Sequence, residues 1–190
     1  MAIVLNIREV IEMNLLENLI QYTEYSKGDI SKKCSIAYED IDIVEFDFSQ
    51  FDLNNVFFGG VNFDKCIFEN VYLSGSNFCG SFLKECILKR NIINKATWDD
   101  MVIEKTKMFS MNAFRTTFMY GKFQDSDFSE CYFEKCSFNN SDFQNVYFKE
   151  CTIKDTDFTE SKFDNVQFIR CKFDNVKFNE NDDKKSIFIN

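Results

Sequence analysis

The chain has 190 residues, with 24 Phe, one Trp, no His and no Pro, and its formal net charge is −9. An acidic surface disfavours direct nucleic-acid binding, because the phosphates would be repelled. Without His the commonest general base is missing, and no phosphate-binding glycine loop is present, so we expect a protein that is not an enzyme and uses no cofactor.

Neither membrane insertion nor export by the general secretory route is expected. No apolar run approaches the roughly 18 residues that a membrane span needs. The first residues lack the positive start and the uninterrupted apolar stretch of a signal peptide. A cytoplasmic location without membrane contact is therefore the expectation.

The first predicted element is an amphipathic helix within an N-terminal segment that we place at residues 1–45. Its apolar positions recur at helical spacing on one side: Ile7, Val10, Ile11, Leu15, Leu16, Leu19 and Ile20. We interpret it as a cap over an open end of the following repeats. The alternative interpretation is a helix that docks a partner or a second copy. Residues 41–43 could form an early, degenerate repeat.

From residue 46 to residue 180 the sequence has a period of five. A large apolar residue recurs in one phase through 27 repeats, and 17 of the 23 Phe in this section occupy that phase. The residue two positions earlier is mostly Val, Cys, Ser, Thr, Ala or Gly. A period of five fits neither a helix nor a flat strand. It fits a square coil with one repeat per side, so that four repeats close a coil and successive coils stack at β-sheet spacing.

The cysteines follow the same period. Six of the eight occupy the small inward position: Cys66, Cys86, Cys131, Cys136, Cys151 and Cys171. Buried Cys acts there as a small apolar residue. The chain has no His and no closely spaced Cys pair, so we expect no metal site.

Two segments carry a resemblance to a known family, Ser126-Asp127-Phe128-Ser129-Glu130 and Ser141-Asp142-Phe143-Gln144-Asn145. Each resembles the pattern of the pentapeptide repeat family, which is a small residue, Asp or Asn, Leu or Phe, and two polar residues. The resemblance covers the section from residue 46 to residue 180. It implies an all-β fold, a right-handed quadrilateral β-helix of about seven coils, here with an N-terminal capping helix.

The middle of the chain departs from the repeat pattern on the outside. Apolar residues occupy outward positions there, and we predict a partner surface from Ile67, Tyr72, Ile87, Ile92, Phe109 and Phe114. Contiguous exposed apolar surface usually marks an interface. The alternative is that the N-terminal segment folds back over these residues. Residues 84–122 have a net charge of +4, whereas the sections before and after are acidic. We call residues 84–122 the basic waist.

The regular pattern stops near residue 180, and residues 181–190 form a C-terminal tail that ends in Ile187, Phe188 and Ile189. This apolar trio could cover the end of the rod or form a homodimer contact. Some pentapeptide repeat proteins dimerise through C-terminal helices, but this tail is too short to match them closely.

Two functions follow as hypotheses. The first is a non-catalytic scaffold that binds an unknown protein partner, which could be a second copy. The second comes from the resemblance, since some family members bind DNA gyrase, a type II topoisomerase, as DNA mimics and modulate quinolone sensitivity. The acidic charge agrees with the second hypothesis, whereas the basic waist and the short C-terminus weaken it. A secreted effector or a toxin-immunity partner is a third idea, for which the sequence offers no support.

Overall fold

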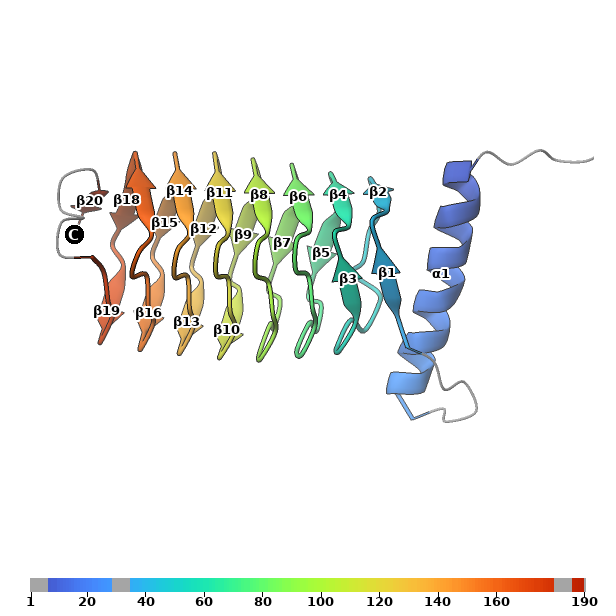
Figure 1. Ribbon diagram of the computed structural model, residues 1–190. Helices are drawn as coiled ribbons and strands as arrows, with labels where there is room; N and C mark the ends of the chain where they lie inside the picture. The colour runs from blue at the N-terminus through green and yellow to red at the C-terminus, as the bar shows by residue number, and fades with distance from the viewer. Residues whose placement is uncertain (1–6, 29–34, 180–185, 190) are drawn as a thin grey trace, which may run out of the picture.

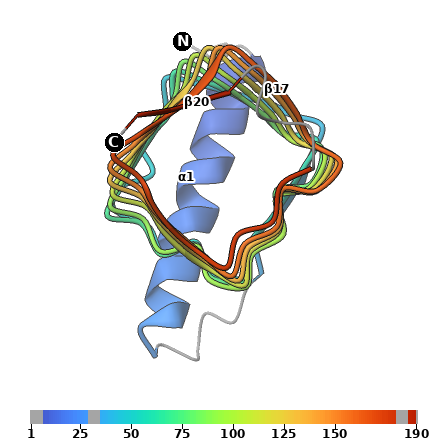
Figure 2. The same cartoon turned by 90° about the vertical axis from the view of Figure 1, so that its left-hand side faces the viewer.

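The computed structural model describes residues 7–28, 35–179 and 186–189, with side chains described for residues 13–28, 35–179 and 189. The chain winds into a rod of stacked coils with one helix, α1 (Ile7–Ser26), at its N-terminal end (Figure 1). Seen along its axis the rod is four-sided (Figure 2). This confirms the predicted right-handed quadrilateral β-helix of about seven coils with an N-terminal helix.

Two of the four faces carry seven-stranded parallel sheets. Face B is built from β2 (Asp42–Val44), β4 (Asn62–Asp64), β6 (Phe82–Lys84), β8 (Val102–Glu104), β11 (Lys122–Gln124), β14 (Asp142–Gln144) and β17 (Lys162–Asp164). Face C is built from β5 (Ile67–Glu69), β7 (Ile87–Lys89), β9 (Lys107–Phe109), β12 (Asp127–Ser129), β15 (Tyr147–Lys149), β18 (Val166–Ile169) and β20 (Ser186–Ile189).

The other two faces are paired less continuously. Face A has β1 (Ala37–Glu39) and β3 (Phe57–Gly59), followed by single bridges such as Asn77 to Thr97. Face D has bridges from Tyr72 upward and then β10 (Asn112–Phe114), β13 (Tyr132–Glu134), β16 (Thr152–Lys154) and β19 (Lys172–Asp174). On all four faces each residue lies beside the residue four repeats later, as Phe123 does beside Phe143.

Each corner of the coil needs a left-handed backbone. Among the residues that the structure describes, twenty-four non-glycine residues have a positive φ, and they fall on every fifth position, as at Lys65 (φ 56°) and Asn70 (φ 57°). This conformation is costly for most side chains outside glycine. Backbone hydrogen bonds between coils offset the cost, for example from Lys65 N to Lys84 O at 2.8 Å. The regular corner is what keeps one large and one small side chain of each repeat inside.

The core is a set of ring columns along the rod axis. On face A the ring of Phe138 lies parallel to those of Phe118 and Phe158, with centroids 4.6 and 4.8 Å away. Neighbouring columns meet edge to face, as Phe133 does with Phe138 at 5.4 Å. Both arrangements are favourable for aromatic pairs. Each buried Phe contributes up to about 3 kcal/mol from loss of contact with water.

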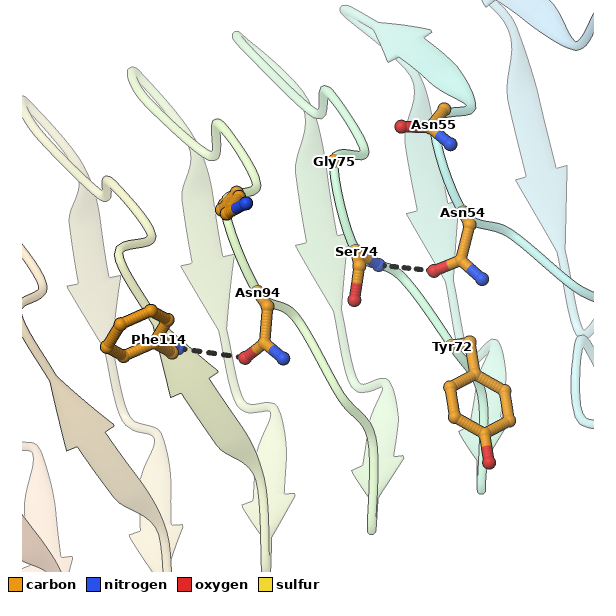
Figure 3. A pocket seen from close by; sticks show the side chains of 8 residues that line it. Asn54, Asn55, Tyr72, Ser74, Gly75, Asn94 and Phe114 are labelled. Atoms are coloured by element: carbon orange, nitrogen blue, oxygen red, sulfur yellow. Dashed lines mark hydrogen bonds between the residues drawn. The ribbon is translucent and has the colours of Figure 1, made fainter.

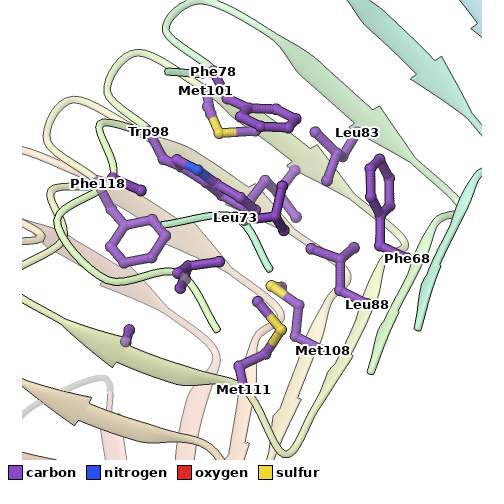
Figure 4. Close-up of a cluster of buried hydrophobic side chains, with 14 of the residues drawn as sticks. Phe68, Leu73, Phe78, Leu83, Leu88, Trp98, Met101, Met108, Met111 and Phe118 are labelled. Carbon is purple, nitrogen blue, oxygen red and sulfur yellow. The ribbon is translucent and has the colours of Figure 1, made fainter. Parts of the chain in front are cut away.

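The face A column is interrupted in the waist. Trp98 lies 4.8 Å from Phe78 at 36° and 5.9 Å from Phe118 at 74°, so the stack turns there. Figure 4 shows Met101 next to Phe78, and Met108 and Met111 next to each other near Leu88; all three methionines are buried. Flexible thioether side chains fill irregular gaps. The inward residues of the waist are therefore buried even though they depart from the repeat pattern.

The side chain at the small inward position also forms a hydrogen bond with the backbone of the preceding coil. Ser141 Oγ donates to Phe118 O at 2.9 Å, and Cys136 Sγ donates to Ala113 O at 3.4 Å. Asn91 fits the same position, because its Nδ2 donates to Phe68 O and its Oδ1 accepts from Val71 N, both at 2.8 Å. Ser, Thr, Cys and Asn can alternate here because each satisfies backbone groups of the adjacent coil.

The helix α1 closes the N-terminal end of the rod, as predicted. Leu15 and Leu19 are fully buried, Tyr22 Oη donates to Asn54 O, and Thr23 Oγ1 accepts from Asp52 N. The prediction that all its apolar residues share one buried face is wrong for Leu16 and Ile20, which are exposed together with Met13. These three residues form a second apolar stripe on the outer side. The side chains of Ile7, Val10 and Ile11 lie outside the described residues.

The coils extend beyond both predicted limits. Tyr38 pairs with Phe58 and Ile43 with Phe63, so repeats precede the expected start at residue 46 and include residues 41–43. At the other end β20 continues face C, with Phe188 in register with Phe168. The residues taken as a separate tail thus include a strand of the solenoid. Phe173, an inward position in the last described strand of face D, is 39% exposed because no described strand follows it there.

Candidate partner surface

The six residues predicted as a partner surface lie on the adjacent faces C and D. Ile67 pairs with Ile87 on face C, and Tyr72 bridges to Ile92 on face D, as their spacing of one coil predicts. One coil further on, Phe109 follows Lys89 on face C, and Phe114 belongs to β10 on face D. We call the set the apolar patch: Ile67, Tyr72, Ile87, Ile92, Phe109 and Phe114.

Half of the apolar patch is well exposed. The exposed fractions are 56% for Tyr72, 45% for Ile87 and 37% for Phe109, whereas the other three side chains are half-buried. The described part of α1 crosses the end of the rod rather than running along faces C and D (Figure 2). The helix therefore leaves Tyr72 and Ile87 open, contrary to the alternative in which the N-terminal segment covers them.

Positive charge surrounds the patch, and part of it is neutralised locally. Lys89 Nζ lies 3.2 Å from Glu69 Oε1, and Arg90 bonds the same carboxylate. Within the described ranges, Lys95, Lys107 and Arg115 form no ion pair. These three cations belong to the basic waist, and Lys107 and Arg115 lie within two residues of Phe109 and Phe114 along the chain.

Phe114 carries two cations on its ring. The guanidinium carbon of Arg115 lies 5.0 Å from the ring centroid, and Lys135 Nζ lies 5.5 Å from it. Such cation–π contacts are worth about 0.5–1 kcal/mol at exposed sites. Lys95, Arg115 and Lys135 occupy the same corner in three successive coils, where face D turns into face A. We call these three residues the basic corner.

A hollow of about 530 Å³ opens on face D between Tyr72 and Phe114 (Figure 3). Its lining residues are Asn54, Asn55, Tyr72, Ser74, Gly75, Asn94, Lys95 and Phe114. The hollow exists because Ser74 and Gly75 are small at outward positions, where neighbouring coils carry larger residues such as Asn, Lys or Phe. Sequence reasoning singled out Tyr72 and Phe114 but missed the amides; the adjacent small residues Ser74 and Gly75 were the available signal.

The C-terminal contact residues are placed only in part. Gln167, Phe168 and Ile169 pair with residues 187, 188 and 189, so the trio lies on face C at the end of the rod. Ile189 is exposed. The side chains of Ile187 and Phe188 lie outside the described residues.

Three of the thiols, those of Cys79, Cys136 and Cys171, have raised pKa values, which disfavour the reactive thiolate. Burial raises the pKa of Cys136 to about 11. A hydrogen bond with Cys151, together with burial, raises the pKa of Cys171, and burial raises that of Cys79. The thiolate is the reactive form of cysteine, so these groups are poor nucleophiles at neutral pH.

Two further features concern ions and membranes. In the part of the chain that the structure covers, no cluster of three or more His, Cys, Asp or Glu side chains could hold a metal ion. Among those same residues, no helix combines the length and the apolar character that crossing a bilayer demands.

The coil geometry and the repeat register define the class of protein. Residues 111–188 match the family model described as "Pentapeptide repeat region", and residues 46–80 and 66–97 match "Pentapeptide repeats (8 copies)". The chain belongs to the pentapeptide repeat family. A search of the curated proteins gave no match.

Several solved structures are similar to this chain at low sequence identity. QnrB1, a plasmid-mediated fluoroquinolone resistance protein, is 13% identical, with 76% of this chain and 92% of that chain covered and a TM-score of 0.41. Rfr23 from the cyanobacterium Cyanothece 51142 is 10% identical, with coverages of 80% and 88% and a TM-score of 0.38. HetL from Nostoc sp. strain PCC 7120, involved in heterocyst differentiation regulation, is 12% identical, with coverages of 74% and 84% and a TM-score of 0.27.

Proposed function

We propose that this pentapeptide repeat protein is a non-catalytic, cytoplasmic scaffold whose protein partner binds the apolar patch. The observation that carries the proposal is the exposure of Tyr72, Ile87 and Phe109 on two adjacent faces of a rod whose outward positions are otherwise mostly polar. Exposed aromatic and aliphatic side chains that become buried on binding supply most of the free energy of many interfaces. Backbone hydrogen bonds between coils hold these residues in a fixed arrangement, for example from Ile87 N to Cys66 O at 3.0 Å, so little ordering is needed on binding.

Affinity capture tests this proposal with a matched pair of variants. The tagged full-length chain is incubated with lysate of its source organism, and retained proteins are identified by mass spectrometry. Tyr72→Ser combined with Ile87→Ser should remove the specific partner. Tyr120→Ser is the control, because Tyr120 is 55% exposed, much like Tyr72, but lies at the corner after face A. Retention of the same proteins by the Tyr72/Ile87 variant would contradict the proposal.

A second candidate function is that of a DNA mimic that binds DNA gyrase. The net charge of −9 and the acidic sections on both sides of the waist favour it. A supercoiling assay with purified gyrase, with and without a quinolone, separates the two functions. Inhibition or protection at micromolar protein would support the gyrase function, and an unchanged supercoiling rate would remove it.

Homodimerisation through the C-terminal end is part of the same proposal. Phe173 and Ile189 are exposed at that end, whereas α1 covers the other. An end-to-end contact between two copies would bury both side chains. Light scattering of the wild type and of Phe173→Ser combined with Ile189→Ser should give the mass of a dimer and of a monomer, respectively. A wild type that is still monomeric at about 100 µM would rule out the end-to-end contact.

A further inference from the structure

The amide groups of the hollow on face D are oriented by the coil next to them. Asn54 Oδ1 accepts a hydrogen bond from Ser74 N at 2.8 Å, and Asn94 Oδ1 accepts one from Phe114 N at 3.1 Å (Figure 3). A backbone N–H can only be satisfied by the oxygen of the amide, so each Nδ2 group must point away from that bond. The Nδ2 groups of Asn54 and Asn94 are therefore directed away from the adjacent coil and are available to donate hydrogen bonds to a ligand.

The charge of the hollow has one sign. Its eight lining residues include one cation, Lys95, and no carboxylate. Arg115 follows Lys95 at the basic corner, and neither residue forms an ion pair within the described chain. Two stacked cations without a counter-charge, next to two outward amide donors, form a surface that complements an anion.

The walls of the hollow are aromatic. Tyr72 lies at one side and Phe114 at the other (Figure 3). A small inorganic anion would leave both rings unused. Asn54 and Asn94 are two coils apart, which is about 10 Å at β-sheet spacing and equals about three residues of extended chain. A ligand that uses the whole hollow is therefore longer than one side chain, and it combines acidic with apolar groups.

We propose that the hollow and the basic corner bind an extended, acidic peptide segment of a partner protein, with carboxylates at Lys95 and Arg115 and an apolar side chain between Tyr72 and Phe114. This proposal rests on the proposed function, because it states the chemistry of the partner at the same patch. A nucleic acid would also bring negative charge. Its backbone would, however, continue onto the acidic sections before residue 84 and after residue 122, where it would be repelled.

Binding of three labelled probes to the full-length chain tests the proposal. The probes are the peptide Glu-Glu-Tyr-Glu-Glu, its neutral counterpart Gln-Gln-Tyr-Gln-Gln, and an oligothymidylate of about eight nucleotides, all carrying the same fluorescein. Fluorescence anisotropy at low salt gives the affinities. A ¹⁵N–¹H spectrum with unlabelled acidic peptide should shift the side-chain amide signals of Asn54 and Asn94.

Two charge-matched double variants locate the site. Lys95→Gln with Arg115→Gln should weaken binding of the acidic peptide at least about tenfold. Lys84→Gln with Lys122→Gln removes the same charge from face B, on the opposite side of the rod, and should change the affinity less than about twofold. Lys84 and Lys122 likewise form no ion pair with any described residue.

Three results would overturn the proposal: equal weakening by both double variants, equal affinity for the neutral peptide, or tighter binding of the oligothymidylate. The capture experiment with Tyr72→Ser and Ile87→Ser distinguishes a failure of this proposal from a failure of the proposed scaffold function. If that variant loses its partner while the Lys95/Arg115 variant keeps it, the patch is a partner surface but does not recognise acidic peptides.

Discussion

The rings of Phe128 and Phe148 lie parallel, with planes 3° apart and centroids 4.7 Å from each other. They are one coil apart in the sequence and belong to paired strands on face C. Their separation equals the spacing of the strands that carry them. Backbone pairing and ring stacking therefore reinforce each other wherever Phe follows Phe in a column, as it does after the waist, and the loss of one ring there should disturb both of its neighbours.

The first prediction concerns this stacking. Phe138→Ala should lower the free energy of unfolding by about 3–5 kcal/mol, because Phe138 is fully buried between Phe118 and Phe158. Phe173→Ala is the control and, at a protein concentration low enough to keep the chain monomeric, should cost about 1 kcal/mol, since Phe173 is partly exposed at the end of the rod. Urea unfolding followed by circular dichroism measures both. Equal losses would show that ring burial does not determine the stability of a coil.

The second prediction concerns a buried amide. Asn91→Leu should cost about 2–4 kcal/mol, because Val71 N and Phe68 O would lose their partners inside the rod. Asn91→Thr should cost about 1 kcal/mol or less, since Thr106 already bonds Cys86 N and Leu83 O in the same way on the next coil. Hydrogen exchange at the Val71 amide should accelerate in the Leu variant and not in the Thr variant.

The third prediction concerns the two sides of α1. Leu19→Ala should lower the free energy of unfolding by about 3 kcal/mol, because Leu19 is fully buried against the end of the rod. Ile20→Ala should change it by less than about 0.5 kcal/mol, because Ile20 is exposed. Thermal unfolding gives the comparison, and light scattering reports whether the Leu19 variant associates through its uncovered end. A large loss of stability in the Ile20 variant would show that the packed side of the helix has been assigned incorrectly.

The fourth prediction is a loss of stability at alkaline pH. Burial raises the pKa of Cys136 from its ordinary value of 9.0 to about 11. The neutral thiol is therefore favoured in the folded chain, and this stabilisation is complete below pH 9 and is lost as the pH rises from 9 to 11. Over that interval the wild type should lose up to about 1.4 kcal/mol per pH unit relative to Cys136→Ser, which keeps a donor and does not titrate there. If the free energies of unfolding of the two proteins fell in parallel between pH 9 and pH 11, the raised pKa of Cys136 would be contradicted.

The phase of the Phe residues was enough to predict the solenoid, because a period of five permits one large inward residue per side and little else. Residues 41–43 could be assigned only as a degenerate repeat and Tyr38 was not assigned to a repeat at all, since the first coil has too few Phe and Leu to set a phase. Leu16 and Ile20 were misplaced because helical spacing identifies apolar positions but not which of two stripes meets the rod. The hollow could not be foreseen from apolar positions alone, since it arises where Ser74 and Gly75 leave outward space.

Because the chain turns a corner at every fifth residue, the number of residues between two surfaces determines how those surfaces are oriented about the rod axis. Adding four whole repeats between α1 and the apolar patch would lengthen the rod by one coil and leave both facing the same way. Adding a single repeat would instead rotate the patch by a quarter turn relative to the helix. Length variation among related rods should therefore preserve a shared partner geometry only in whole coils, and the insertion of one repeat after Gly60 offers a direct way to turn one surface against the other.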